Sequence, residues 1–174
     1  MKRIAAIDER AFIWIASHHS TQPGELLPRL FHWISKSADG HLYPVLLALM
    51  FFVDDTHGLL LLYTALMAYT LEVPLYLILK HIFKRPRPCD FIMHLEAFIV
   101  PGDKFSLPSG HTAAAFLMAT IVCYFYPIAI IPSFIWASAV GLSRVVLRVH
   151  FPIDVMLGAS LGVTVALVTI KVLE

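Results

Sequence analysis

Long apolar runs separated by short polar segments dominate the chain. The clear runs are residues 59–79, 112–126, 128–140 and 153–173. A helix needs roughly 20 apolar residues to cross the hydrocarbon core of a bilayer. Residues 59–79 reach that length with Glu72 as their only formal charge, and Pro74 predicts a kink within them. The pattern therefore predicts several membrane-spanning helices.

A shorter apolar run covers residues 41–53 and is followed by Asp54. It predicts a fifth span if the helix also includes the residues just before His41, around the Asp39–Gly40 turn signal. Residues 26–34 predict another short helix. The first twenty residues predict an amphipathic helix in the membrane interface or on the edge of the bundle, from apolar positions at helical spacing: Ile4, Ile7, Ala11, Trp14 and Ile15. We expect an all-α polytopic bundle of about five to six spans, forming one domain over residues 1–174.

Composition supports a membrane protein. The 174 residues are 59% hydrophobic and only 14% charged, whereas soluble domains average about 25% charged. A net charge of +1 and the lack of a lysine-rich tail give no sign of a nucleic-acid partner. We expect Cys89 and Cys123 to be unpaired, and the sequence does not predict an oligomeric state.

The polar residues gather in three places that the spans bring together. The long insertion, residues 80–109, lies between the helix that begins near Leu59 and the helix that begins near Thr112. Because successive spans alternate in direction, the segment from Arg144 to Asp154 returns to the same side. Three polar clusters therefore converge at one membrane face, and charged groups near a bilayer indicate function.

These clusters contain groups that bind phosphate. Lys80, Arg87 and Arg144 are cations whose N–H donors suit a tetrahedral anion. Ser109 and Gly110 stand at a predicted helix start, where free backbone N–H groups and the helix dipole favour an anion. The sequence predicts a phosphate-binding site from these five residues.

Two histidines add reactivity to this site. His111 and His150 each lie beside a predicted helix N-terminus, and Asp154 follows His150 by four residues. We expect Asp154 to orient His150, which attacks phosphorus to form a phosphohistidine. We expect His111 to protonate the leaving oxygen and then to activate water. The mechanism uses no metal or cofactor, and the other histidines do not have metal-ligand spacing: His18, His19, His81 and His94.

Three motifs carry a resemblance to a known family. They are Lys80-x6-Arg87-Pro88, Pro108-Ser109-Gly110-His111 and Ser143-Arg144-x5-His150-x3-Asp154. In order and internal spacing they resemble the signature of the type 2 phosphatidic acid phosphatase family, over a core of about residues 59–172. The resemblance implies a helical membrane bundle and metal-independent hydrolysis of lipid phosphates or diphosphates through a histidine nucleophile. It implies the same roles for the histidines, Asp154 and the phosphate-binding residues.

The substrate stays open among the lipids that the resemblance implies. These are undecaprenyl diphosphate, which we weakly prefer, phosphatidylglycerophosphate and phosphatidic acid. A lipid phosphotransferase using the same histidine and a non-catalytic lipid-binding protein are the alternatives. The resemblance implies a bacterial inner (cytoplasmic) membrane with the site at its outer face, although the basic residues at that face would favour the cytoplasmic side.

Some polar residues lie outside the phosphatase motifs or have an open role. We expect Lys84, Arg85 and Arg148 to be interfacial anchors, with contact to a substrate headgroup as the alternative for Arg148. Ser143 is predicted either to bind phosphate or to cap local backbone. Glu72 lies inside a span without a predicted partner.

Overall fold

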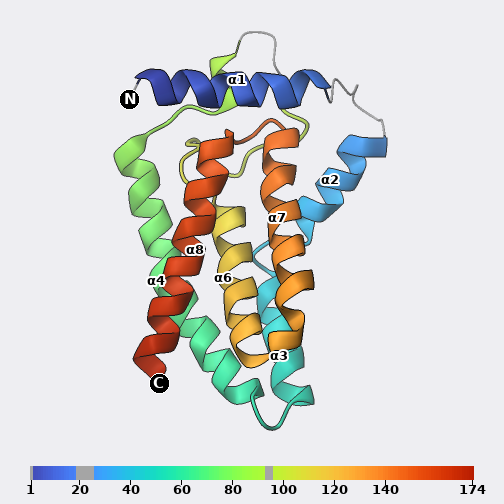
Figure 1. The fold of residues 1–174 in the computed structure, drawn as a ribbon, viewed down its shortest axis with the longest axis vertical. Coiled ribbons are helices and arrows are strands. Elements are labelled where there is room, and N and C mark those ends of the chain that lie inside the picture. Colours follow the sequence, from blue (N-terminus) through green and yellow to red (C-terminus); the bar gives the residue numbers. More distant parts are fainter. Residues whose placement is uncertain (1, 19–25, 93–95) are drawn as a thin grey trace.

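The computed structural model describes residues 2–18, 26–92 and 96–174, and every regular element in these ranges is helical. This confirms the all-α prediction. Figure 1 shows α4, α6, α7 and α8 running in alternating directions as a bundle. The elements are α1 (Lys2–His18), α2 (Leu26–Lys36), α3 (Leu42–Val53), α4 (Gly58–Phe83), α5 (Pro88–Phe91), α6 (Gly110–Phe125), the 3₁₀ turn η1 (Pro127–Ala129), α7 (Ile130–Val146) and α8 (Pro152–Leu173).

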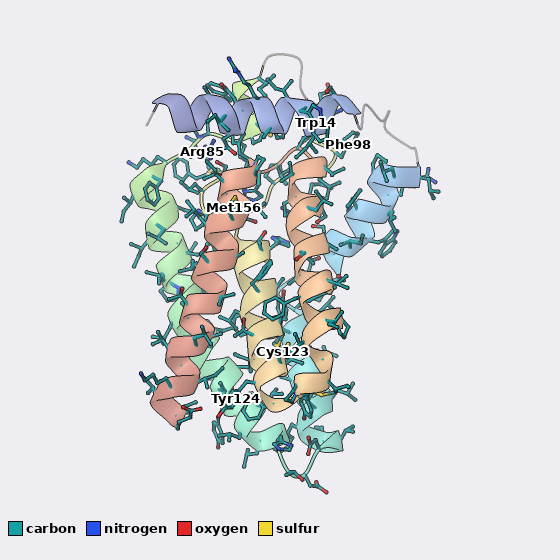
Figure 2. The ribbon with its side chains drawn as sticks, in the orientation of Figure 1. Trp14, Arg85, Phe98, Cys123, Tyr124 and Met156 are labelled. Carbon is teal, nitrogen blue, oxygen red and sulfur yellow. The ribbon has the colours of Figure 1, made fainter. Side chains whose placement is uncertain are left out.

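The bundle has the length and surface of a membrane-spanning protein. Within the described ranges, three helical stretches are long and apolar enough to cross a membrane: Gly58–Phe91, Pro127–Val146 and Pro152–Leu173. Helices α3 and α6 are shorter apolar helices. Side chains project outward along the whole bundle (Figure 2). Many of these are large and apolar, such as Ile78, Ile135 and Leu167, and such side chains suit contact with lipid tails.

Helix α6 lies at the centre of the bundle, where small residues allow its neighbours to approach closely. It contacts α4, α7 and α8. On α8, a Cβ added to Gly162 would lie 2.1 Å from the carbonyl oxygen of Ala113, and one added to Gly158 would lie 2.5 Å from that of Ser109. Small residues four apart are typical of close helix pairs in membranes. This packing fixes the start of α6 beside the start of α8, where the Ser109 N–H donates to the Asp154 carbonyl at 3.0 Å.

The polar segments meet at one end of the bundle, as alternation of the spans predicts. Helix α4 ends there at Phe83, α6 begins at Gly110, α7 ends at Val146 and α8 begins at Pro152 (Figure 1). Segments that are far apart in the sequence therefore surround one volume below α1.

Helix α1 lies across this end of the bundle (Figure 1). The Phe12 ring packs against the Phe151 ring with 5.3 Å between centroids, and the Asp8 carboxylate accepts a hydrogen bond from the Ile153 N–H at 2.9 Å. Of the apolar positions that predict this helix, Ile7 and Trp14 are exposed. The buried face includes a carboxylate because the helix start below it presents free N–H donors.

The predicted short helix over residues 26–34 is α2, and the predicted fifth span corresponds to α3, which is not extended by the residues before it. A turn over residues 37–41 separates the two helices, and in it the Ala38 and Asp39 N–H groups donate to the carbonyls of Ser35 and Lys36. This turn lies near the other polar segments, and its Asp39 side chain contacts the start of α6. The Asp39–Gly40 turn signal therefore marks a real interruption.

Enlarging Gly162 tests the close packing of α8 on α6. We expect Gly162→Ala to lower the free energy of unfolding by about 1–3 kcal/mol, because its methyl group overlaps backbone atoms of α6. Thermal unfolding of the detergent-purified protein measures this. Gly40→Ala is the control because a Cβ there meets nothing within 4 Å. Equal melting temperatures for the two variants would contradict the packing account.

Candidate active site

A cavity of about 680 Å³ opens where the polar segments meet. Six of the eight residues predicted for the site line this cavity: Lys80, Arg87, Gly110, His111, Arg144 and His150. They belong to the end of α4 and the following loop, the start of α6, and the end of α7 and the following loop. The structure thus brings the three motifs around one space. The two predicted residues outside the lining, Ser109 and Asp154, are fully buried beside it.

The His150 imidazole makes a hydrogen bond through one ring nitrogen and directs the other toward the cavity cations. Its side chain is buried, and Nδ1 lies 2.7 Å from the carbonyl oxygen of Ser106. A carbonyl only accepts, so Nδ1 carries the proton and donates. Nε2 then carries the ring lone pair, which accepts a long hydrogen bond from Nη1 of Arg87 at 3.4 Å. The geometry directs an unprotonated ring nitrogen toward the cavity cations.

The surroundings keep this imidazole neutral. Burial, followed by the positive charges of the three cavity cations, holds the pKa of His150 well below its ordinary value of 6.5. A neutral imidazole has the lone pair that a nucleophile needs, whereas a protonated one does not. His150 is therefore in its reactive form at neutral pH.

Asp154 lies near His150 without a direct hydrogen bond to it. Its Oδ2 is 3.7 Å from Nδ1 of His150, longer than a hydrogen bond. Instead Oδ2 accepts from the Phe151 N–H at 2.8 Å, and Oδ1 accepts from Arg85 at 2.7 Å. The nearest contact to His150 Nδ1 is therefore the Ser106 carbonyl, which the sequence did not indicate.

Two of the three cations share one loop carboxylate as their counter-ion. Asp103 contacts Lys80 Nζ at 2.6 Å and Arg87 Nη2 at 2.7 Å. Burial alone would raise the pKa of the Asp103 carboxyl, but the hydrogen bond and charge of Lys80, together with the charge of Arg87, lower it. Asp103 is thus a counter-ion inside the predicted phosphate site.

The guanidinium of Arg144 has fewer of its hydrogen-bond donors paired. Its Nη1 donates to the Ser35 hydroxyl, while Nε is buried without a partner among the described residues. A buried guanidinium N–H without an acceptor is costly. Since Arg144 lines the cavity, its unpaired donor favours an anion there.

The start of α6 differs in detail from the predicted phosphate cradle. Ser109 occupies the N-cap position, but its hydroxyl lies 2.8 Å from that of Thr112 and makes no capping bond to backbone. Gly110 lines the cavity, and a Cβ there would lie 3.3 Å from the Tyr76 ring. The backbone at this helix start, rather than the Ser109 side chain, faces the cavity.

His111 has a carboxylate partner that sequence reasoning missed. Its Nε2 lies 3.2 Å from Oδ1 of Asp39 in the turn between α2 and α3. The Asp39–Gly40 dipeptide predicts a turn, but nothing in the sequence indicates that Asp39 contacts His111, 72 positions later. Ser143 donates to the Val140 carbonyl at 2.6 Å, in agreement with its alternative as a local backbone cap.

The fold and site have known relatives. The family model described as "PAP2 superfamily" matches residues 57–174. The chain belongs to the PAP2 superfamily. This confirms the resemblance that the three motifs carry.

Similar proteins of the superfamily come from several bacteria. Phosphatidylglycerophosphatase B of Bacillus subtilis is 35% identical over 125 residues, which cover 65% of this chain and 57% of the relative. Decaprenylphosphoryl-5-phosphoribose phosphatase of Mycobacterium tuberculosis is 33% identical over 92 residues, 51% of this chain and 48% of the relative. The matches thus span about half the length of these curated relatives.

Solved structures agree over nearly the whole chain. The crystal structure of Aquifex aeolicus LpxE superposes with a TM-score of 0.81 at 27% identity and covers 93% of each chain. A transmembrane PAP2 type phosphatidylglycerolphosphate phosphatase from Bacillus subtilis gives 0.77 at 26% identity, covering 99% of this chain and 87% of that one. These matches extend the PAP2 likeness beyond the motif-bearing core to the N-terminal helices.

The prediction that Arg85 of this PAP2 protein is an interfacial anchor is wrong. Its guanidinium instead bridges the buried carboxylates of Asp8 and Asp154. The same guanidinium lies over the Phe151 ring, 4.2 Å from its centroid. Arg85 therefore ties α1 to the start of α8 beside His150.

Metal binding receives no support from the described residues. Among them, no group of three or more His, Cys, Asp or Glu side chains is placed to hold a metal ion. His19 and His94 lie outside the described residues.

Removing the Arg85 charge tests this bridge. Arg85→Gln leaves two buried carboxylates without their shared cation, so we expect a loss of about 3–5 kcal/mol in the free energy of unfolding. Thermal unfolding in detergent measures it, with Lys84→Gln as the control on the exposed neighbouring residue. Adding Asp8→Asn to Arg85→Gln should restore part of the loss. An Arg85→Gln protein as stable as the control would refute the bridge.

Proposed function

We propose that this PAP2 protein is an integral membrane phosphatase that removes the terminal phosphate from a lipid phosphate or diphosphate. One observation carries the proposal: a buried, neutral His150 directs its unprotonated Nε2 toward Arg87, one of three buried cations that line the cavity. A nucleophile at the centre of an anion site suits phosphoryl transfer. The names of the relatives as phosphatases point the same way.

In the proposed first step, Nε2 of His150 attacks phosphorus, and the bond from phosphorus to the lipid oxygen breaks. His111 donates a proton to that oxygen, and the lipid leaves as the alcohol, or as the monophosphate when the substrate is a diphosphate. The Ser106 carbonyl continues to accept from Nδ1–H, and the Asp154 carboxylate at 3.7 Å stabilises the positive ring of the phosphohistidine.

In the second step, His111 takes a proton from water, which attacks the phosphohistidine and releases inorganic phosphate. Asp39 lies within hydrogen-bond distance of His111, and its carboxylate opposes burial and the Arg144 charge, which both disfavour the protonated ring. His150 returns to the neutral state, so protons and charges balance over the cycle.

Phosphate oxygens are bound by Lys80, Arg87 and Arg144 and by the backbone at Gly110. Asp103 occupies the donors of two of these cations in the structure, so a bound phosphate must replace that carboxylate. The unpaired Nε of Arg144 gains an acceptor at the same time. This exchange keeps an anion between the cations in both states.

The lower part of the cavity suits the lipid portion of the substrate. It continues between α3 and α4 along Leu47, Phe51, Leu62 and Leu66. Undecaprenyl diphosphate, phosphatidylglycerophosphate and phosphatidic acid all have an apolar tail for this space. We place the protein in the bacterial cytoplasmic membrane, as one domain, with the site at the outer face.

The direct test is phosphate release by the detergent-purified protein from each of the three lipids, in EDTA. We expect His150→Gln to lower the rate at least about 10³-fold, because the nucleophile is lost. His57→Gln is the matched control, since His57 is exposed and precedes α4 at the opposite end of the bundle (Figure 1). A His150→Gln enzyme that keeps its rate would disprove the mechanism. Release only when an acceptor lipid is added would support phosphotransfer instead.

A further inference from the structure

Glu72 is a buried carboxyl that the proposed catalytic mechanism does not use. Its side chain is 1% exposed, and Oε1 has no hydrogen-bond partner among the described residues. None of the ion pairs in the described ranges involves it. A carboxyl without a partner inside a membrane protein is costly and indicates a functional site.

The Glu72 side chain lines the same cavity as His150 and the cations. Tyr69, Glu72, Tyr76 and Lys80 recur at helical spacing, so they form one face of α4, and all four line the cavity. Eight residues of helix separate Glu72 from Lys80, which is about 12 Å along the axis. Glu72 therefore lies below the phosphate site, between it and the apolar part of the cavity.

A second unpaired polar group faces Glu72's part of the cavity. Tyr43 of α3 is 4% exposed, and its hydroxyl has no partner among the described residues. Its ring lies 5.4 Å from that of Tyr69, one helical turn before Glu72. The Tyr69 hydroxyl, by contrast, donates to the Ala114 carbonyl at 3.1 Å. An unused acceptor and an unused hydroxyl thus line one cavity on facing helices.

We propose that Glu72 and Tyr43 form a polar subsite for hydrogen-bonding groups of the substrate's backbone. A hydroxyl or amide N–H of the substrate donates to Glu72, and a carbonyl or hydroxyl oxygen accepts from Tyr43. At about two helical turns from Lys80, these groups belong to the part of the lipid next to its phosphate. The inference rests on the proposed function and narrows its substrate.

This subsite distinguishes between the candidate substrates. Glycerol-based and sugar-based lipid phosphates have hydroxyl, ester or amide groups close to the phosphate. A polyprenyl chain has neither donors nor acceptors, and the inner phosphate of a polyprenyl diphosphate has acceptors but no donor, so Glu72 would stay unpaired and desolvated. Sites built to hydrogen-bond a substrate discriminate strongly against an analogue that lacks the group. We therefore infer that the substrate is a glycerol- or sugar-based lipid, in place of the polyprenyl diphosphate that the sequence analysis prefers.

Two substrates that differ in these groups test the subsite. One is a 1-acylglycerol 3-phosphate, with an ester and a free hydroxyl, and the other is a short polyprenyl phosphate of similar carbon number. We expect the wild type to favour the acylglycerol phosphate at least about tenfold in kcat/KM. Glu72→Leu and Tyr43→Phe should each reduce this ratio several-fold by slowing the acylglycerol phosphate alone.

Controls separate recognition from folding. Tyr63→Phe, on the exposed face of α4, should keep the wild-type ratio, and Glu72→Gln preserves side-chain volume if Glu72→Leu fails to fold. Equal losses on both substrates for every subsite variant would show a purely structural role and overturn the proposal. A wild type without preference would overturn it as well.

A binding measurement distinguishes failure of the subsite from failure of the proposed hydrolysis. If the wild type releases no phosphate from any lipid, hydrolysis is refuted, but thermal stabilisation of His150→Gln by the two lipids still reports binding. The subsite predicts a larger shift with the acylglycerol phosphate, and it predicts that adding Tyr43→Phe removes the difference. Equal shifts for the two lipids would refute the subsite.

Discussion

Repulsion between three buried cations is the constraint on which this end of the bundle depends. Lys80, Arg87 and Arg144 surround one cavity while each is almost fully buried. Asp103 pairs with two of them and offsets part of their charge, and Arg144 keeps an unpaired donor. Their combined charge, added to burial, keeps the nearby His150 imidazole neutral. In the proposed mechanism, the same charges therefore supply both the affinity for a phosphate and the neutral form of the attacking histidine.

The surrounding structure holds these charges in place through backbone packing and buried carboxylates. Gly158 and Gly162 bring α8 against α6, so that the Asp154 carbonyl meets the Ser109 N–H. Arg85 then joins the Asp154 side chain to Asp8 of α1, which crosses the end of the bundle. The N-terminal helix is thereby tied to the start of α8 at Asp154, four residues after His150, although it lies outside the family match.

The features that could be predicted from the sequence are those that follow from apolar periodicity and from the spacing of residues within a motif. Apolar runs predicted the helices, alternation of the spans predicted the convergence of the polar segments, and motif spacing indicated the family. Contacts between distant segments could not be predicted, because no local pattern records them. Asp39 beside His111, the Ser106 carbonyl beside His150 and the Asp8–Arg85 bridge are of this kind. Arg85 looked like a surface anchor because charge alone does not reveal burial.

The central claim is that Nε2 of His150 attacks phosphorus. Rapid quenching of turnover in alkali, followed by mass spectrometry of the digested protein, tests it most directly, because phosphohistidine survives alkali. An activated aryl phosphate is a suitable substrate with the His111→Gln variant, since its leaving group needs no proton and hydrolysis of the intermediate is slowed. The account predicts one phosphoryl group on His150. A phosphoryl group on another residue, or turnover without a phosphorylated enzyme, would contradict it.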